Sequence, residues 1–225
     1  QINRGECHTT LYRHIPSGTL WTVIIRHYPE YNALEWQAEI YAPEKTGIFS
    51  DIRYELNVPG THGRLLGNYG DEGGGYKEFD FSLDNERVYQ EAETGRPTHY
   101  VFPYYRLETD QNKITTVLSW QGAWFSQFEQ AADGVNISMG QKNICAYLEK
   151  GEGFRLPLML IQEYSSDPVN AWRRFYIDCN MPLVKGERVK PLLAAFNGVC
   201  AGLNNDIVRR VKETYDAHGI DYDFW

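Results

Sequence analysis

Two stretches of this 225-residue chain decide its fold class, Gly95-Arg-Pro-Thr-His-Tyr-Val-Phe-Pro-Tyr-Tyr-Arg-Leu107 and Ile114-Thr-Thr-Val-Leu-Ser-Trp-Gln-Gly-Ala-Trp-Phe125. The first enters an aromatic strand from a Gly-Arg-Pro turn. A polar Glu-Thr-Asp-Gln-Asn turn then reverses the chain into the second stretch, which is rich in β-branched residues and ends in two tryptophans, Trp120 and Trp124. These patterns predict neighbouring strands of a large antiparallel sheet.

Short strand patterns recur from about residue 9 to residue 164, with turn residues between them. The predicted strands cover residues 10–14, 20–27, 35–41, 52–56, 77–81, 99–107, 114–125, 134–137, 143–148 and 154–164. Strands this short and numerous predict an antiparallel β-sandwich. The apolar runs 20–25 and 156–161 are expected in the middle of the sandwich, and the alternating run 35–41 is expected to have one solvent-exposed face. Seven glycines between residues 60 and 75 predict a long mobile loop.

After residue 164 the hydrophobic period changes to that of a helix. Ser166-Asp167-Pro168 is a helix start, and Val169, Trp172, Phe175 and Tyr176 then share one face. This linker helix is expected to leave the sandwich. A connector rich in Pro, Gly and charge follows it up to residue 190.

The last segment has the pattern of a βαβ unit. Residues 191–196 form a short apolar strand, Asn204 or Asn205 caps a helix, Gly219 ends that helix, and residues 220–225 begin another strand. One βαβ unit buries neither face of its strands, so further chain is expected after it. The predicted domains are a sandwich at 1–165, a linker helix and connector at 166–190, and the start of a truncated barrel at 191–225.

Composition excludes several classes of function. The net charge of -8 argues against nucleic-acid binding, because that requires clustered Lys and Arg. A mean hydropathy of -0.51 and the lack of an apolar run near twenty residues argue against a membrane span. The four cysteines form no C-x-x-C pair, and the histidines lack metal spacing, so neither a metal nor a cofactor is predicted. Cys145 and Cys200 are expected to be buried, and cysteine usage leaves the cellular compartment open.

The two opening stretches resemble the amino-terminal domain of glycoside hydrolase family 36, the α-galactosidase-like enzymes. That family has a Gly-Arg-Ser-Ser turn, a Phe-Pro-Phe-Phe strand and a Gly-Trp-Ser-Gly-Gln-Trp strand at this spacing. Residues 28–36 are similar to its Tyr-Pro-x-Phe-Pro-Ala-Val-Glu-Trp, and residues 150–157 to its Pro-Gly-Glu-Ser-Phe-x-x-Pro. Trp172-Arg-Arg-Phe175 and the barrel opening with Gly219-Ile-Asp-Tyr222 complete the resemblance.

The resemblance implies a retaining glycosidase that cleaves α-galactosides or related α-linked sugars, with a (β/α)₈ barrel after the sandwich. The family's two catalytic aspartates follow the fourth and sixth barrel strands, whereas this chain stops in the second. No catalytic residue is therefore assigned, and this piece alone is expected to be inactive. Asp221 and Asp223 are interpreted as polar residues at the entry of a strand.

The carboxyl end of the first barrel strand, Asn197-Gly198-Val199, is the only part of the active face expected in this chain. The resemblance implies that Asn197 and Gly198 bind substrate. The family often has Trp after the Asn, so Gly198 leaves space for a larger substituent such as N-acetyl and puts galactose specificity in doubt. The alternative is that Asn197 only satisfies backbone groups in a turn.

Four aromatic side chains, Tyr104, Tyr105, Trp120 and Trp124, predict either a sugar-stacking platform or part of the core, and core is the commoner role in a sandwich. Glu35 and Arg96 are expected to form a buried pair or to hold a turn, not to act in catalysis.

Two alternatives to hydrolysis remain open, a glycosyl-transferring relative such as a raffinose-type synthase and a non-catalytic carbohydrate-binding module. The unfinished βαβ unit argues against the free module. The expected partners are an oligosaccharide or glycoside substrate and the remainder of the same enzyme, with homo-oligomer formation left open and with no nucleic acid or membrane.

Overall fold

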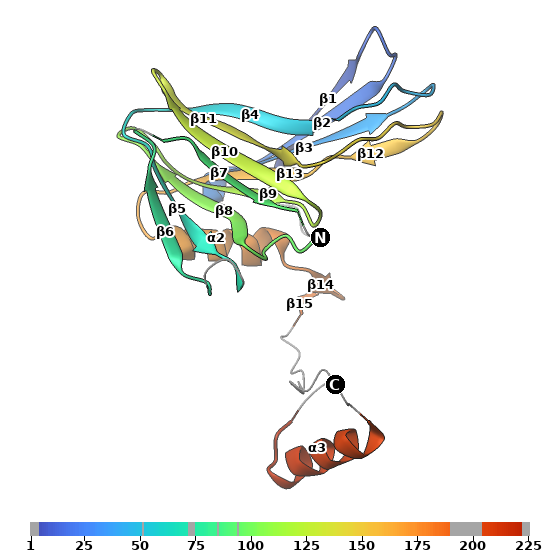
Figure 1. The fold of residues 1–225 in the computed structure, drawn as a ribbon, viewed down its shortest axis with the longest axis vertical. Coiled ribbons are helices and arrows are strands. Elements are labelled where there is room, and N and C mark those ends of the chain that lie inside the picture. The colour runs from blue at the N-terminus through green and yellow to red at the C-terminus, as the bar shows by residue number, and fades with distance from the viewer. Residues whose placement is uncertain are drawn as a thin grey trace. The chain divides into compact units, whose positions relative to one another are not determined.

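The computed structural model describes residues 5–50, 52–71, 75–84, 86–93, 95–189 and 204–221. They belong to two compact units that divide after Asn180. The larger unit is a sandwich of two antiparallel sheets, and the smaller sheet lies in front of the larger one in Figure 1. The predicted mainly β, antiparallel sandwich is therefore confirmed.

The larger sheet has nine strands in the order β1-β2-β3-β13-β9-β8-β5-β6, and β12 also pairs with β3. These strands are β1 (Glu6–Arg13), β2 (Leu20–Tyr28), β3 (Ala33–Tyr41), β5 (Arg64–Tyr69), β6 (Glu78–Ser82), β8 (Val101–Glu108), β9 (Lys113–Ser119), β12 (Gly153–Arg155) and β13 (Leu158–Glu163). A short 3-10 helix, η1 (Pro29–Tyr31), joins β2 to β3. The smaller sheet has four strands, β4-β11-β10-β7. Its strands are β4 (Ile52–Pro59), β7 (Val88–Ala92), β10 (Trp124–Ala131) and β11 (Gly134–Gln141).

Alternating side chains from the two sheets build the core. In β10, Trp124, Ser126 and Phe128 are buried between the sheets, while Phe125 and Gln127 lie on the outer face. This period of two follows from the pleat of a strand. The largest fully buried side chains include Trp124, Tyr105, Phe128, Leu65, Leu107, Leu118, Ile137, Met139 and Met159.

The two sheets differ in width, and this leaves part of the larger sheet uncovered. The outer ends of β1, β2, β3 and β12 extend beyond the four-stranded sheet at the upper right of Figure 1. All eight residues of β1 are exposed, and the apolar run 20–25 in β2 is only half-buried. The prediction that this run lies in the middle of the sandwich is wrong. The run 156–161 is largely buried, because β13 lies between β3 and β9.

The described part of the glycine-rich segment 60–75 is not the predicted mobile loop, since it contains strand β5. A Cβ on Gly67 would lie 2.4 Å from the Phe79 ring, and one on Gly63 would lie 2.7 Å from Val135. These glycines permit close approach of packed side chains. Leu65 between them is fully buried.

Three other strand predictions differ from the structure. Residues 143–148 form no strand, and only an isolated bridge joins Ala146 to Phe49. The predicted strand 114–125 is divided into β9 and β10 by a turn at residues 120–123, and 154–164 is divided into β12 and β13. Strand β7 was not predicted, because its sequence, Val-Tyr-Gln-Glu-Ala, is short and does not alternate regularly between apolar and polar residues.

Helix α2 (Pro168–Phe175) begins where the sequence predicts. The Asp167 side chain accepts a hydrogen bond from the backbone N–H of Asn170 at 3.2 Å. The helix continues as a π-helical turn, η2 (Tyr176–Asn180), and Phe175 and Cys179 pack into a second cluster with Tyr28, Ala33 and Leu160. Because it buries Phe175 against the sheet, the helix belongs to the sandwich unit rather than to a free linker.

The connector after Asn180 contains a small hairpin, β14 (Leu183–Val184) and β15 (Glu187–Arg188). Its two turn residues, Lys185 and Gly186, both have positive φ, at 53° and 85°. This geometry is that of a tight two-residue hairpin turn.

The second unit contains helix α3 (Asn205–Ala217), as the βαβ pattern predicts. The Asn204 side chain caps it by accepting from the N–H groups of Asp206 and Ile207, both at 3.1 Å. Gly219 follows its end with a φ of +63°. The first predicted strand lies outside the described residues. Of the second, only Ile220 and Asp221 are described, and neither is in a strand.

Candidate functional site

The two substrate-binding residues predicted from the sequence, Asn197 and Gly198, lie outside the described residues. Their role stays a prediction. The four aromatic side chains of the predicted platform are all described, and the structure divides them into two pairs.

Trp124 and Tyr105 belong to the core, and both are 0% exposed. The Trp124 indole N–H donates to the carbonyl of Pro97 at 2.8 Å, which joins the Gly-Arg-Pro turn to the core. The Tyr105 ring meets Phe128 edge to face, with centroids 4.9 Å apart, and burial raises the pKa of the Tyr105 phenol above its ordinary value. Neither ring can stack on a sugar without unfolding of the sandwich.

Tyr104, on the outer face of the nine-stranded sheet, and Trp120, in the turn after β9, line a shallow hollow of about 570 Å³, and Trp120 also packs against the core. We call this the outer hollow. Tyr104 meets Trp172 of α2 at a centroid distance of 5.4 Å and an angle of 62°. The lining also includes Phe102, Val117 and the half-exposed Val169. The hollow is therefore an apolar surface with aromatic side chains from one strand, a turn and a helix.

The turn at residues 120–123 positions the Trp120 ring in the outer hollow. A Cβ on Gly122 would lie 2.6 Å from the Trp120 indole nitrogen, so any side chain at residue 122 would displace the ring. The Gln121-Gly122 pair between the two tryptophans thus has a packing function.

Arg96 holds the Gly-Arg-Pro turn in place. Its guanidinium donates to the Asp71 carboxylate at 2.5 Å, and His99 Nδ1 lies 3.4 Å from the other oxygen of the same carboxylate. The Arg96 side chain is 57% exposed, so this is a surface ion pair that anchors a turn. Of the two roles expected for Arg96, the structure supports the turn.

Glu35 is the buried member of a separate polar cluster. Its carboxylate accepts a hydrogen bond from the Tyr28 hydroxyl at 3.0 Å and lies 3.7 Å from the Arg26 guanidinium. Burial raises the pKa of the Glu35 carboxyl from its ordinary value of 4.5, and the bond from Tyr28 and the charge of Arg26 oppose this only in part. The cluster lies beneath η2 and connects β2 to β3.

This raised pKa predicts a pH-dependent stability. The folded state keeps the Glu35 proton to higher pH than the unfolded state does, so the stabilising contribution of this proton is fully present below 4.5 and is lost as the pH rises through the folded pKa. Glu35→Gln keeps an acceptor for Tyr28 but cannot ionise. We expect the free energy of unfolding of this variant to decrease less with rising pH than that of the wild type. Urea unfolding at several pH values measures the difference. Glu39→Gln, an exposed site on the same strand, is the control and should keep the wild-type slope.

The described residues limit other kinds of site. No three His, Cys, Asp or Glu side chains among them lie close enough to hold a metal ion. Within the same residues no helix has the length and apolar character needed to cross a membrane. Cys145 is exposed, which corrects the expectation that it is buried, because residues 143–148 lie outside both sheets. Cys7 is also exposed, Cys179 is buried, and Cys200 lies outside the described residues.

Comparison with known proteins shows where this architecture recurs. No protein-family model matches the chain, and no curated protein matches it. The α-galactosidase from Lactobacillus brevis has a TM-score of 0.75 at 12% identity, over 98% of this chain and 32% of that one. The galactosidase domain of an α-galactosidase-sucrose kinase matches with a TM-score of 0.75 at 14% identity, over 96% of this chain and 32% of that one. A family 36 α-galactosidase from Geobacillus stearothermophilus matches with a TM-score of 0.73 at 16% identity, over 96% of this chain and 32% of its own.

The chain has the fold of a family 36 α-galactosidase segment. It spans about a third of the length of these solved structures. The match to the Lactobacillus brevis structure covers 98% of this chain, so it includes residues of the unit that contains α3 as well as the sandwich.

Proposed function

We propose that this chain is the sandwich and barrel opening of a retaining glycoside hydrolase that cleaves α-galactosides or related α-linked sugars. The observation that carries the proposal is the fold match to several α-galactosidases over at least 95% of the chain, sandwich and α3 unit included. A free carbohydrate-binding module would account for the sandwich alone. In this proposal the catalytic aspartates belong to the remainder of the enzyme, and the 225-residue piece by itself is expected to have no turnover.

The sandwich acts in this enzyme as a support, and the outer hollow is the surface on which the remainder of the protein packs. Its lining is apolar and includes the partly exposed Trp120 and Val169. Large exposed apolar patches usually mark a contact surface. Helix α2 contributes Val169 and Trp172 to the hollow, and the sandwich unit ends soon after it, at Asn180.

Hydrolysis by the longer protein that contains this sequence tests the proposal. We expect turnover of p-nitrophenyl α-galactoside, with the α-anomer of galactose as the first product in an NMR time course, because a retaining enzyme conserves the anomeric configuration. The same assay on the 225-residue chain should give no turnover. Transfer of galactose to sucrose in place of water would support the raffinose-type synthase, and inactivity on every α-linked sugar would contradict the proposal.

Substrate choice depends, in this proposal, on Asn197 and Gly198 at the end of the first barrel strand. Gly198→Trp in the longer protein would close the space beside the sugar. We expect it to lower kcat/KM for p-nitrophenyl α-N-acetylgalactosaminide about tenfold more than for the α-galactoside, since the larger substituent loses its room. Val184→Trp is the control, because Val184 is exposed in the connector hairpin. An equal decrease in kcat/KM for both substrates would show that Gly198 does not determine substrate specificity.

A further inference from the structure

A second pocket lies on the uncovered part of the larger sheet, between the β1–β2 hairpin and the segment that joins β3 to β4. Its volume is about 380 Å³, within the range of small-molecule sites. We call it the wing pocket. It is lined by His14, Ser17, Thr19, Trp21, Ile40, residues 46–49 and Ile52.

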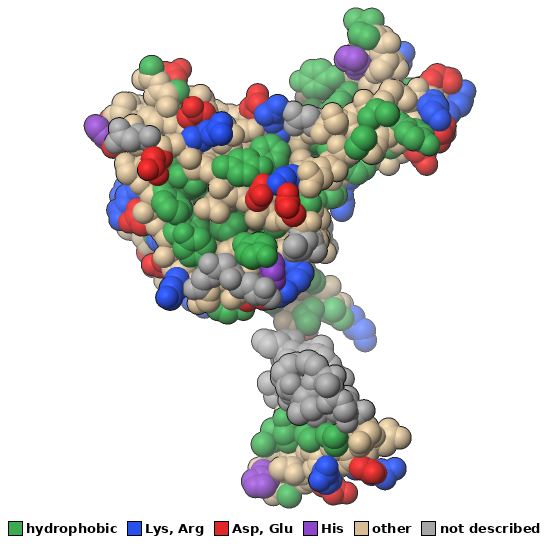
Figure 2. All heavy atoms as spheres, viewed as in Figure 1, with side chains coloured by type: hydrophobic (Ala, Val, Ile, Leu, Met, Phe, Trp, Pro, Cys, Tyr) green, Lys and Arg blue, Asp and Glu red, His purple; other side chains and the backbone are tan. Residues whose placement is uncertain are grey.

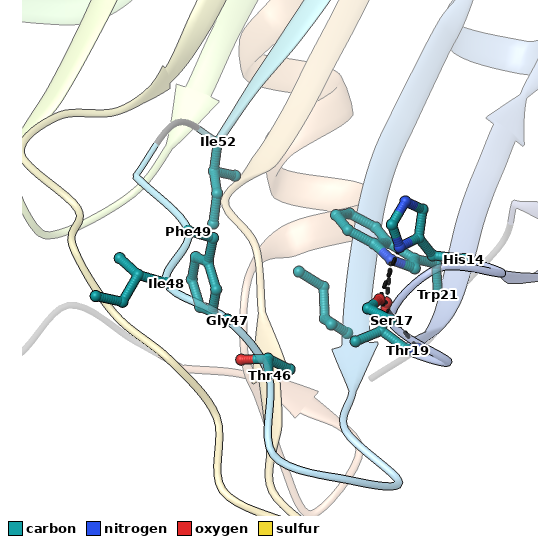
Figure 3. A pocket seen from close by; sticks show the side chains of 10 residues that line it. His14, Ser17, Thr19, Trp21, Thr46, Gly47, Ile48, Phe49 and Ile52 are labelled. Carbon is teal, nitrogen blue, oxygen red and sulfur yellow. Dashed lines mark hydrogen bonds between the residues drawn. The ribbon is translucent and has the colours of Figure 1, made fainter.

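One wall of the wing pocket is a chain of hydrogen-bonded side chains (Figure 3). The Trp21 indole N–H donates to the Thr19 hydroxyl oxygen at 3.2 Å, Thr19 and Ser17 hydroxyl oxygens are 2.8 Å apart, and Ser17 Oγ lies 2.7 Å from His14 Nδ1. An indole N–H can only donate, so the chain can run from Trp21 through both hydroxyls to Nδ1. A neutral His14 then carries its proton on Nε2, where it can donate to a ligand.

The opposite wall is apolar. Figure 3 shows Ile48, Phe49 and Ile52 across the pocket from His14 and Trp21. Ile48 is 72% exposed although it lines the pocket, whereas Ile52 is buried. His14 is the only lining side chain that can carry a charge among those described. The pocket therefore suits a neutral ligand with one apolar face and several hydroxyl groups.

We propose that the wing pocket binds a terminal pyranose unit of a neutral oligosaccharide. A pyranose ring has apolar C–H faces, which pack on aromatic and aliphatic side chains, and a rim of hydroxyls, which exchange hydrogen bonds with a polar wall. The proposal rests on the proposed function, which makes an α-galactoside the sugar that this protein meets. An apolar side chain of another protein fits the wall of Ile48 and Phe49 but leaves the His14 end of the polar wall unused.

Titration of the 225-residue chain with raffinose tests this binding directly. The proposed function assigns the catalytic aspartates to the remainder of the enzyme, so the titration of this chain should report binding without turnover. The readout is the indole N–H signal of Trp21 in the ¹H–¹⁵N spectrum, assigned with Trp21→Phe. We expect a saturable shift with a Kd on the order of 1 mM, as for a single sugar unit in an open pocket.

Gly47→Leu is the blocking variant. Gly47 lines the pocket, and a Cβ there meets no atom within 4 Å, so the leucine fills open space without disturbing the fold. We expect it to weaken raffinose binding at least about tenfold. Gly153→Leu is the matched control, because its Cβ would make only an ordinary contact of 3.4 Å with the Ile40 carbonyl and Gly153 lies outside the lining. It should bind as the wild type does.

His14→Ala tests the polar wall separately and should weaken binding about threefold to tenfold, the usual loss for one hydrogen bond. No saturable shift with raffinose, or an unchanged Kd in Gly47→Leu, would overturn the proposal. Hydrolysis by the longer protein together with a failed titration would reject the wing pocket and leave the proposed function standing. Saturable binding of a Leu-rich peptide without raffinose binding would show a protein-docking site instead.

Discussion

Trp124→Ala is expected to destabilise the sandwich by about 3–5 kcal/mol, close to the whole stability of many domains. The indole is fully buried between the sheets, and its N–H donates to the Pro97 carbonyl at 2.8 Å. The substitution therefore opens a large cavity and also removes the bond that holds the Gly-Arg-Pro turn. Urea unfolding followed by circular dichroism measures the loss, and the variant should accumulate as unfolded or insoluble protein near 37 °C.

Trp120→Ala is the matched control for this experiment. Trp120 lies four residues earlier, in the turn between β9 and β10, and its ring is only partly buried, because it lines the outer hollow as well as packing against the core. We expect a loss of less than about 1 kcal/mol, since a partly exposed ring gives up less buried area. Equal losses for the two tryptophans would contradict the division of the aromatic residues into core and surface.

Gly70→Ala is expected to destabilise the sandwich by about 1–3 kcal/mol or more, although it adds one methyl group. A Cβ there would lie 2.0 Å from the Thr98 carbonyl oxygen and 2.5 Å from that of His99. Both are backbone atoms, so no side-chain rotation relieves the contact. The Gly70 N–H also donates to the Tyr100 carbonyl at 2.8 Å, and the methyl group would force the two segments apart.

The control for this prediction is Gly47→Ala, where an added Cβ meets nothing within 4 Å. That variant should be as stable as the wild type, or slightly more stable because alanine restricts the unfolded chain. Thermal unfolding of the three proteins under one set of conditions gives the comparison. If Gly70→Ala leaves the stability unchanged, the turn at residues 98–100 must move freely. The contacts of Arg96 and His99 with Asp71 oppose such movement.

The glycine-rich segment shows where sequence reasoning failed and why. Glycine in a sequence has two explanations, freedom of the backbone and the need for close approach, and composition does not separate them. At Gly67 and Gly70 the structure supports the need for close approach. A Cβ added at these glycines would lie within 3 Å of the Phe79 ring and of the Thr98 carbonyl oxygen, respectively. Those neighbours are known only once β5 is paired with β6 and β8.

The aromatic residues of the candidate site show the same limit. Adjacent residues of a strand point to opposite faces, so Tyr104 and Tyr105 could not both belong to one surface. That much follows from the sequence. Only the packing of the second sheet decides which of these two tyrosines points into the core. The four-stranded sheet covers the side on which Tyr105 lies, so Tyr105 is buried and Tyr104 packs against Trp172.

The sequence by itself determined the features that rest on local interactions. The Asp167 cap of α2 and the Asn204 cap of α3 both depend on residues a few positions apart. The order of motifs also carried the family 36 resemblance, which the fold match supports.

Only the tertiary structure decided the features that depend on segments far apart in the chain. The unequal widths of the sheets left β2 half-buried despite its apolar sequence, and the wing pocket joins residues 14–21 to residues 46–52. Burial depends on what covers a strand, not on the strand itself. A local pattern states which side chains can be buried together, and the pairing of distant strands selects which of them are.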